Sequence, residues 1–454
     1  MSKPVRRSIL VAVAGAVVVT VGIAWSRRPV PEVKRLVLLG FDGVSPNLLE
    51  PLVAQGKLPA IRRLMDRGSY GPLRSFRPAK SGVLWTSIAT GKSMLKHGIV
   101  DWTYVNEQGI EVPYQGEGRR AKTYWEILAE RGLRTGTINW WVTYPPRPVA
   151  NSYVVSSAFR LRQHPSTVDP PRLFDWLNAL RLRRPAVPAE MKERGVPDWS
   201  PEEATLPLGS AEPILLAYGA YFAQDVTIDR VSDYLWVQQP VEVFSTYFRL
   251  VDVTSHFAEH FMDRRVHDEV AALEAAGKAT PADVARLDRE MARVTAHAYQ
   301  FMDGIIAKYL ERMDEHTALI VCSDHGFRFF KGHYDHYAPG LEAPDGVLFL
   351  AGPGVRGGHR IAGASLLDIA PTILHWMGQP VAEDMDGGVL RQALEEHVRW
   401  NPVRTVATYE SGATAAGTAP ADPAVSEEVL EDLRTLGYIE APAGGTPRPS
   451  PTPR

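Results

Sequence analysis

Five acidic and imidazole side chains follow apolar segments of this sequence, in positions where they could bind metal ions: Asp42, Asp252, His256, Asp324 and His325. Each is a weak signal alone, because an Asp after a strand is often only a turn former. Together, buried carboxylates and imidazoles would destabilise the fold unless a cation neutralised them. Mixed Asp and His ligands favour zinc, or another divalent first-row metal, over calcium or magnesium.

A serine lies between the first two of these residues, where another apolar run begins. Ser81 precedes a helical pattern that ends near Gly91, which predicts that Ser81 is the N-cap of a helix. Serine is commonplace at that position for purely structural reasons. The functional alternative is that the helix N-terminus and a metal ion together favour the ionised hydroxyl. Ser81 would then be a nucleophile beside an anion-binding site.

The elements that must position these residues alternate between strands and helices. Apolar runs predict buried strands at residues 36–41, 243–251, 318–322 and 347–350. Helical patterns that stop at a Gly lie at residues 58–67, 123–131 and 366–377. This alternation predicts an α/β fold with a mostly parallel central sheet and helices on both faces. The candidate ligands would then meet beyond the carboxyl ends of the strands, where such sheets bind ligands.

The segments outside this alternation suggest the domain organisation. We expect an N-terminal anchor and linker at residues 1–33, a catalytic domain at 34–400, and a C-terminal segment at 401–454. The Pro-, Arg- and Trp-rich residues 160–235 predict a helical cap insertion over the sheet edge. The C-terminal segment contains one helix candidate at 426–436 and a Pro-rich tail at 441–454 that we expect to be disordered.

The N-terminus carries a membrane signal. Residues 8–25 contain no charged side chain and are flanked by arginine pairs on both sides. About 18 apolar residues are just enough to cross a bilayer as a helix. We expect an uncleaved anchor with the catalytic domain exported to the periplasmic or extracellular side. Secretion after cleavage of a signal peptide is the alternative.

The composition limits the remaining classes of function. The net charge of −2 provides no electrostatic reason to expect nucleic-acid binding. The single cysteine, Cys322, excludes an intrachain disulfide.

The order of these motifs resembles the alkaline phosphatase superfamily, and most closely its type I phosphodiesterase/nucleotide pyrophosphatase branch. The resemblance covers about residues 35–390. It rests on Phe41-Asp42-Gly43, the helix-opening Ser81, Thr90-Gly91 followed by His97-Gly98-Ile99, Asp252-x-x-x-His256 and Ser323-Asp324-His325-Gly326. It implies an alkaline-phosphatase-like fold and hydrolysis of phosphoryl esters.

The resemblance also implies two divalent metal ions, most simply Zn²⁺. Asp42, Ser81, Asp324 and His325 would surround one ion, whereas Asp252, His256 and a later histidine would hold the other. His333 and His336 both qualify as that histidine, and His336 is preferred because it is closer to the next strand. Ser81 would attack phosphorus in line and form a covalent intermediate, which water would then hydrolyse.

Three departures from the branch bear on the substrate. Ser81 replaces the usual Thr, and Val100-Asp101-Trp102 replaces an Asn that binds a phosphoryl oxygen. Lys80 could take over from this Asn or could simply be solvated. The Lys-x-Arg pair with which related monoesterases hold a dianionic phosphate is missing, and Phe159-Arg160-Leu161-Arg162 is a poor substitute. The missing pair favours phosphodiesters or nucleotide pyrophosphate bonds, in a small-molecule, lipid or glycan substrate.

Other functions remain open at this point. The alternatives are a phosphomonoesterase, a membrane-associated phosphoryl-group transferase and an inactive relative that only binds. A sulfatase is disfavoured because Ser81-Gly82-Val83-Leu84 lacks the Pro and Arg of the sulfatase motif. Several aromatic and amide side chains near predicted strand ends could line the substrate pocket or pack in the core: Trp102, Asn139, Trp140, Trp141 and Tyr144.

Overall fold

A computed structural model describes most of the chain. The described residues are 32–194, 211–258, 264–330, 333–336, 342–399, 401–410, 422–435 and 438–439. The predicted membrane anchor at 8–25 and the predicted tail at 441–454 lie outside these ranges. Among the described helices, none is both long enough and apolar enough to cross a membrane.

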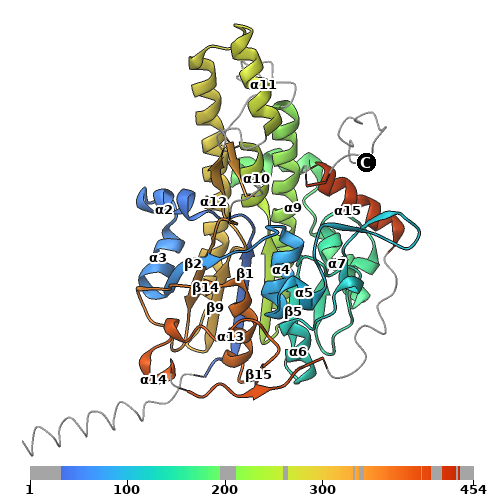
Figure 1. Ribbon diagram of the computed structural model, residues 1–454, viewed down its shortest axis with the longest axis vertical. Helices are drawn as coiled ribbons and strands as arrows, with labels where there is room; N and C mark the ends of the chain where they lie inside the picture. Colours follow the sequence, from blue (N-terminus) through green and yellow to red (C-terminus); the bar gives the residue numbers. More distant parts are fainter. Residues whose placement is uncertain are drawn as a thin grey trace, which may run out of the picture.

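A ten-stranded sheet forms the centre of the described part of the molecule (Figure 1). Its strand order is β13-β2-β12-β9-β1-β8-β5-β6-β7, and β14 pairs with β2. The central strands β9, β1, β8, β5 and β6 are all parallel, whereas β12 is antiparallel to β9 and β2. The predicted mostly parallel sheet is therefore confirmed. The strands are β1 (Arg35–Phe41), β2 (Ser69–Arg74), β5 (Thr135–Ile138), β6 (Tyr153–Val155), β7 (Val168–Asp169), β8 (Val243–Phe248), β9 (Thr317–Cys322), β12 (Gly346–Ala351), β13 (His359–Arg360) and β14 (Ala364–Ser365).

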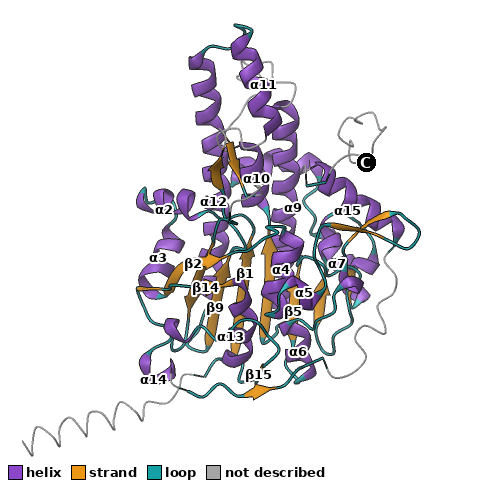
Figure 2. Cartoon of the chain, in the orientation of Figure 1, coloured by secondary structure: helices purple, strands orange, loops and turns teal. Residues whose placement is uncertain are grey.

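Helices cover both faces of this sheet, as Figure 2 shows. Alternate residues of β1 face opposite ways, so that Val37 and Leu39 join one core cluster and Leu36 and Leu38 join the other. One face is covered by α2 (Pro46–Ala54), α3 (Pro59–Arg67), α9 (Ala211–Gln238), α10 (Leu250–Ala258) and α12 (Pro281–Arg312). The other face is covered by α4 (Ser81–Thr90), α6 (Tyr124–Glu130) and α13 (Ile369–Trp376).

The remaining elements lie around this three-layer body. The helix α11 (Arg264–Ala275) and the first part of α12 project beyond it at the top of Figure 1. Within the predicted cap at 160–235, β7 joins the sheet edge, while α7 (Phe174–Ala179) and α8 (Val187–Glu193) lie outside the sheet; the cap as a separate unit remains a proposal. The other elements are α5 (Met94–His97), α14 (Glu396–Arg399), α15 (Pro423–Thr435), β3 (Thr103–Val105), β4 (Glu111–Pro113), β10 (Arg328–Phe330), β11 (His333–Asp335), β15 (Val381–Ala382) and β16 (Thr405–Val406).

A buried ion pair stabilises the start of α6. Thr123 and Glu126 form a capping box, and Arg119 donates two hydrogen bonds of 2.7 Å to the Glu126 carboxylate. Burial raises the pKa of Glu126, but the charge and hydrogen bonds of Arg119 outweigh burial and lower it from 4.5 to about 2.

This depressed pKa predicts how the pair responds to pH. Glu126→Gln should lower the free energy of unfolding by about 3 kcal/mol at neutral pH, since one pKa unit corresponds to about 1.4 kcal/mol. The contribution is complete above the unfolded pKa of 4.5 and is lost as the pH falls toward the folded value of about 2. Urea unfolding of both proteins across this range measures the difference. A difference that does not change with pH would contradict the ion-pair account.

Candidate metal centre and active site

The first cluster of candidate ligands lies where β1 and β9 end. Asp42 directly follows β1, and Asp324 and His325 follow β9 by two and three residues. Because the two strands are parallel neighbours, their carboxyl ends meet at one edge. His325 Nε2 lies 3.3 Å from Asp42 Oδ1 and 3.7 Å from Asp324 Oδ2. One ligand atom from each of the three residues lies within 4.8 Å of the others, which is close enough to share one ion.

The second cluster lies on α10 and after β11. Asp252 Oδ1 is 3.5 Å from His256 Nε2, one helical turn later, and His256 Nε2 is 2.9 Å from His336 Nε2. Asp252 was expected directly after a strand at 243–251, but β8 ends at Phe248 and Asp252 lies in the first turn of α10. The apolar run continues past the strand because the helix also packs against the core. The histidine predicted from the spacing, His336, belongs to this cluster, and for the alternative, His333, the structure describes only its place in β11.

The two clusters form one continuous site. His325 Nε2 of the first cluster lies 3.6 Å from Asp252 Oδ1 of the second. The rings of His325 and His336 stack with their centroids 4.0 Å apart and an interplanar angle of 7°. All the residues of the two clusters except the half-buried His256 are buried.

The site concentrates negative charge away from water. Burial raises the pKa of Asp42, but His325 and a hydrogen bond from Tyr247 bring it down to about 2. Burial and the neighbouring Asp42 charge raise the pKa of Asp324 well above its usual range. Burial lowers the pKa of His325, yet the surrounding carboxylates outweigh this effect and raise it to about 10. The carboxylates thus draw positive charge to the site.

Several polar atoms at this site are buried without a hydrogen-bond partner among the described residues. They are Asp42 Oδ1, Ser81 Oγ, Asp252 Oδ1, both carboxylate oxygens of Asp324 and His325 Nε2. Unsatisfied buried polar atoms are rare and costly in folded proteins, and metal ligation is one of their common explanations. The donor set of carboxylate oxygens, imidazole nitrogens and a hydroxyl therefore fits divalent first-row cations.

Ser81 lies at the start of α4 beside this site. It is the first helical residue, and Lys80 is the N-cap, so the prediction of an N-cap serine was wrong by one position. Its side chain is buried. The His336 side chain lies close to the backbone of Ala79, which places the segment before Ser81 next to the second cluster. The unsatisfied N–H groups of the helix N-terminus favour an anion there.

The cationic side chains considered from the sequence for phosphate binding are paired with acids. Lys80 forms an ion pair with Asp101, whose carboxylate also accepts a 2.6 Å hydrogen bond from the Trp102 backbone. Arg160 contacts Asp432 at 3.4 Å, and Arg162 contacts Glu428 at 2.8 Å.

The aromatic residues divide between the site and the core. Trp140 is buried and donates to the backbone oxygen of Trp85, so it belongs to the core. Trp141 donates to the Tyr247 hydroxyl at 2.7 Å, and Tyr247 in turn donates to Asp42. Trp102 lies beside Gly82, the residue after Ser81.

Among the described residues, the contacts of the other two pocket candidates, like those of Trp140, are with residues outside the two clusters. Asn139 donates to the Tyr247 backbone oxygen, and Tyr144 packs in a separate small cluster with Ala158 and Val425. Tyr247 was missed from the sequence, although its place one residue before the end of β8 could have indicated it.

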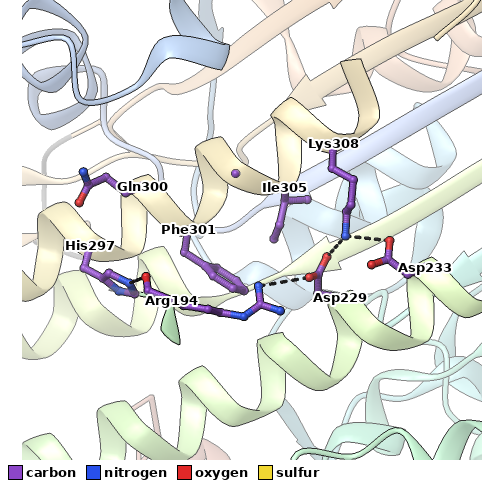
Figure 3. A pocket seen from close by; sticks show the side chains of 9 residues that line it. Arg194, Asp229, Asp233, His297, Gln300, Phe301, Ile305 and Lys308 are labelled. Carbon is purple, nitrogen blue, oxygen red and sulfur yellow. Dashed lines mark hydrogen bonds and ion pairs between the residues drawn. The ribbon is translucent and has the colours of Figure 1, made fainter. Parts of the chain in front are cut away.

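A cavity of about 550 Å³ lies elsewhere, between α9 and α12 (Figure 3). None of its lining residues belongs to the two clusters. Its charged side chains pair with one another: Arg194 with Asp229 at 3.4 Å, and Lys308 with Asp233 at 2.8 Å. These pairs leave no net charge to attract a charged ligand, and we assign this cavity no function.

The parallel sheet, with Asp and His clusters and a helix-opening serine at its carboxyl edge, defines a hydrolase of the alkaline phosphatase superfamily. The chain belongs to the type I phosphodiesterase/nucleotide pyrophosphatase family, whose model matches residues 36–344. It is therefore an enzyme that hydrolyses phosphoryl esters. No curated protein matches the chain in sequence.

Solved structures share the fold at low sequence identity. A candidate sulfatase from Bacteroides thetaiotaomicron is 11% identical, with a TM-score of 0.50 over 80% of this chain and 75% of its own. Murine ectonucleotide pyrophosphatase/phosphodiesterase 5, solved in complex with AMP, is 12% identical, with a TM-score of 0.44 over 80% of this chain and 100% of its own. Phosphonate monoester hydrolase from Silicibacter pomeroyi is 16% identical, with a TM-score of 0.45 over 80% and 76%.

A glycine between the clusters offers a test of the geometry. Gly43 has a φ of +68°, and a Cβ added there would lie 2.7 Å from the Cα and Cβ of Asp252. Gly43→Ala should therefore displace Asp252 and lower kcat/KM by about tenfold or more, in addition to backbone strain of about 1–2 kcal/mol.

The matched control is Gly56→Ala. Gly56 has a similar φ of +73°, but a Cβ there would meet no atom within 4 Å. Gly56→Ala should carry the same backbone strain, measured as a lower midpoint of thermal unfolding, and should keep its activity. Equal activity in the two variants would show that the approach of Gly43 to Asp252 has no bearing on the site.

Proposed function

We propose that this enzyme is a metal-dependent hydrolase of phosphodiester or nucleotide pyrophosphate bonds, in which Ser81 is the nucleophile. The observation that carries this proposal is the pair of adjoining Asp/His clusters, in which several buried polar atoms, like Ser81 Oγ, have no hydrogen-bond partner among the described residues. Asp42, Ser81, Asp324 and His325 would hold one divalent cation, and Asp252, His256 and His336 the other. Zn²⁺ suits this mixture of oxygen and imidazole ligands best.

Each part of the site has a task in this proposal. Bound divalent cations would stabilise negative charge on the phosphoryl oxygens and on the Ser81 oxygen. The start of α4 orients Ser81, and its free N–H groups face the anionic substrate. Ser81 Oγ gives up its proton to water and forms a bond to phosphorus, while the bond to the leaving-group oxygen breaks and that oxygen takes up a proton from water. Water then cleaves the phosphoserine ester, and the free hydroxyl returns.

The pairing of cations supports a diester rather than a monoester. A monoester phosphate carries up to two negative charges, and its second charge needs an additional cationic partner. Lys80, Arg160 and Arg162 are each engaged by a carboxylate. A diester or pyrophosphate linkage has only one negative charge per phosphoryl group and does not need them.

The location of the enzyme is also a proposal. The uncharged residues 8–25 support an N-terminal membrane anchor that holds the catalytic domain on the exported side. A cleaved signal peptide would leave the same domain free. In either case the site is unaffected, because every proposed ligand lies at or after Asp42.

Replacement of the nucleophile is the first test. Ser81→Ala removes the attacking oxygen but keeps the Asp and His ligands, so turnover should fall by about 10³-fold or more while elemental analysis still finds about two zinc ions per chain. Ser81→Thr should retain measurable turnover, because it keeps a hydroxyl at the same position.

A second serine near α4 serves as the control. Ser93 lies outside the two clusters, and Ser93→Ala should keep its activity. Ser87 is less suitable, because its buried hydroxyl contacts His97 at 2.8 Å. Near-normal turnover of Ser81→Ala with metals bound would rule out the serine nucleophile, and a chain that binds no divalent metal would rule out the whole proposal.

The substrate class is tested by comparing aryl esters with the same leaving group. The purified enzyme should hydrolyse a phosphate diester with a kcat/KM at least about tenfold above that for the monoester, and a sulfate ester more slowly still. Asp101→Asn should free Lys80 and raise monoester hydrolysis relative to diester hydrolysis. A monoester preference in the unchanged enzyme would instead favour the phosphomonoesterase alternative.

A further inference from the structure

The C-terminal part of the chain lies against the candidate site, although the family match ends at residue 344. The helix α15 lies at the same end of the sheet as α10 and the start of α4 (Figure 1). Val425, Leu430 and Leu433 of this helix are buried. We call α15 together with Tyr438 the C-terminal arm.

Tyr438 reaches the second cluster directly. Its hydroxyl donates a 2.5 Å hydrogen bond to Asp252 Oδ2. Its ring stacks on Trp102, with centroids 4.8 Å apart and an interplanar angle of 8°. It packs against the His256 ring in a T-shaped arrangement, with centroids 5.4 Å apart. The ring is thus held on one side by a residue next to the nucleophile helix and on the other by a candidate ligand.

This hydrogen bond distinguishes the two oxygens of Asp252. Oδ2 is occupied by the Tyr438 hydroxyl, whereas Oδ1 faces His256 at 3.5 Å and His325 at 3.6 Å. Only Oδ1 lacks a hydrogen-bond partner among the described residues. A hydrogen bond to one oxygen of a carboxylate ligand fixes the direction in which the second oxygen points. Residues that hydrogen-bond to a metal ligand affect metal affinity in this way.

A buried ion pair attaches the arm to the element that carries Asp252. Asp432 of α15 accepts hydrogen bonds of 2.7 and 3.0 Å from the Arg249 guanidinium, and Arg160 approaches it at 3.4 Å. Arg249 is the residue between β8 and α10, three positions before Asp252. Both partners are almost completely buried. Two-point contact between buried charges sets orientation as well as position.

We propose that the C-terminal arm completes the catalytic site and that Tyr438 is a positioning residue, which holds Asp252 Oδ1 toward the metal through its hydrogen bond to Oδ2. The inference rests on the proposed function, because it takes Asp252 as a metal ligand. It adds a part of the chain beyond the family match to the machinery of the reaction. The anchor of this part is the Asp432–Arg249 pair.

The decisive measurement is the zinc affinity of the full-length chain, by competition with a chelator. Tyr438→Phe keeps the ring and its stacking on Trp102 but removes the hydroxyl. The zinc dissociation constant of the site formed by Asp252, His256 and His336 should rise by about 10- to 100-fold, the usual effect of losing a residue that hydrogen-bonds to a metal ligand. Turnover should fall in buffer without added zinc and recover when zinc is raised.

The matched control is Tyr409→Phe, which removes a buried hydroxyl that donates to the Pro380 backbone oxygen at 2.7 Å. Its zinc affinity should equal that of the unchanged chain. Equal zinc affinity in Tyr438→Phe would overturn the inference. Faster turnover in that variant would also overturn it, because Tyr438 would then obstruct the site.

The role of the anchor is tested by a double-mutant cycle. Asp432→Asn should lower zinc affinity in the unchanged chain and add little in the Tyr438→Phe background, because both changes act through the same hydroxyl. Circular dichroism verifies that each variant is folded. Equal losses in both backgrounds would contradict the coupling. If the unchanged chain binds no zinc, the proposed function and this inference are both wrong. If it binds zinc with an affinity that Tyr438→Phe does not change, only this inference is wrong.

Discussion

Three carboxylates buried around one imidazole impose the main physical constraint on this structure. Asp42, Asp252 and Asp324 each place an oxygen between 3.3 and 3.7 Å from His325 Nε2. Like charges removed from water repel strongly, and burial together with the Asp42 charge accordingly raises the pKa of Asp324 well above its usual range. The surrounding contacts limit this cost: Tyr247 donates to Asp42, and the parallel strands bring the charges together only at the open edge of the sheet. The arrangement is best understood as a preformed cradle for cations.

The parts of this cradle that depend on local sequence were predictable. A buried parallel strand needs an uninterrupted apolar run, so a charged residue within one or two positions of the end of such a run marks the carboxyl edge of the sheet. Asp42 and Asp324 follow this pattern. The family resemblance implied a histidine between two strands, and His336 was preferred over His333 because it lies closer to the next strand. The helix that begins at Ser81 was visible from its apolar pattern and its Gly stop, with an error of one residue at the start.

The parts that depend on distant contacts were not predictable. The run at 243–251 looks like one strand because Leu250 and Val251 are apolar, yet they are apolar for packing in a helix. Only the fold reveals where β8 ends. Tyr438 had no signal at all, since nothing in its neighbours indicates a metal site. Its place depends on the ion pair between Asp432 and Arg249, which lie 183 residues apart.

The position of β1 has a consequence for how the protein is made. This first strand lies in the centre of the sheet, between β8 and β9, and both neighbours come more than 200 residues later in the chain. Its backbone groups therefore cannot pair with β8 before residue 248 has been synthesised, nor with β9 before residue 322. Such non-local pairing slows folding and exposes an apolar strand for longer. Nascent chains shorter than this would need protection from aggregation, and a chain crossing a membrane in the unfolded state would have time to do so.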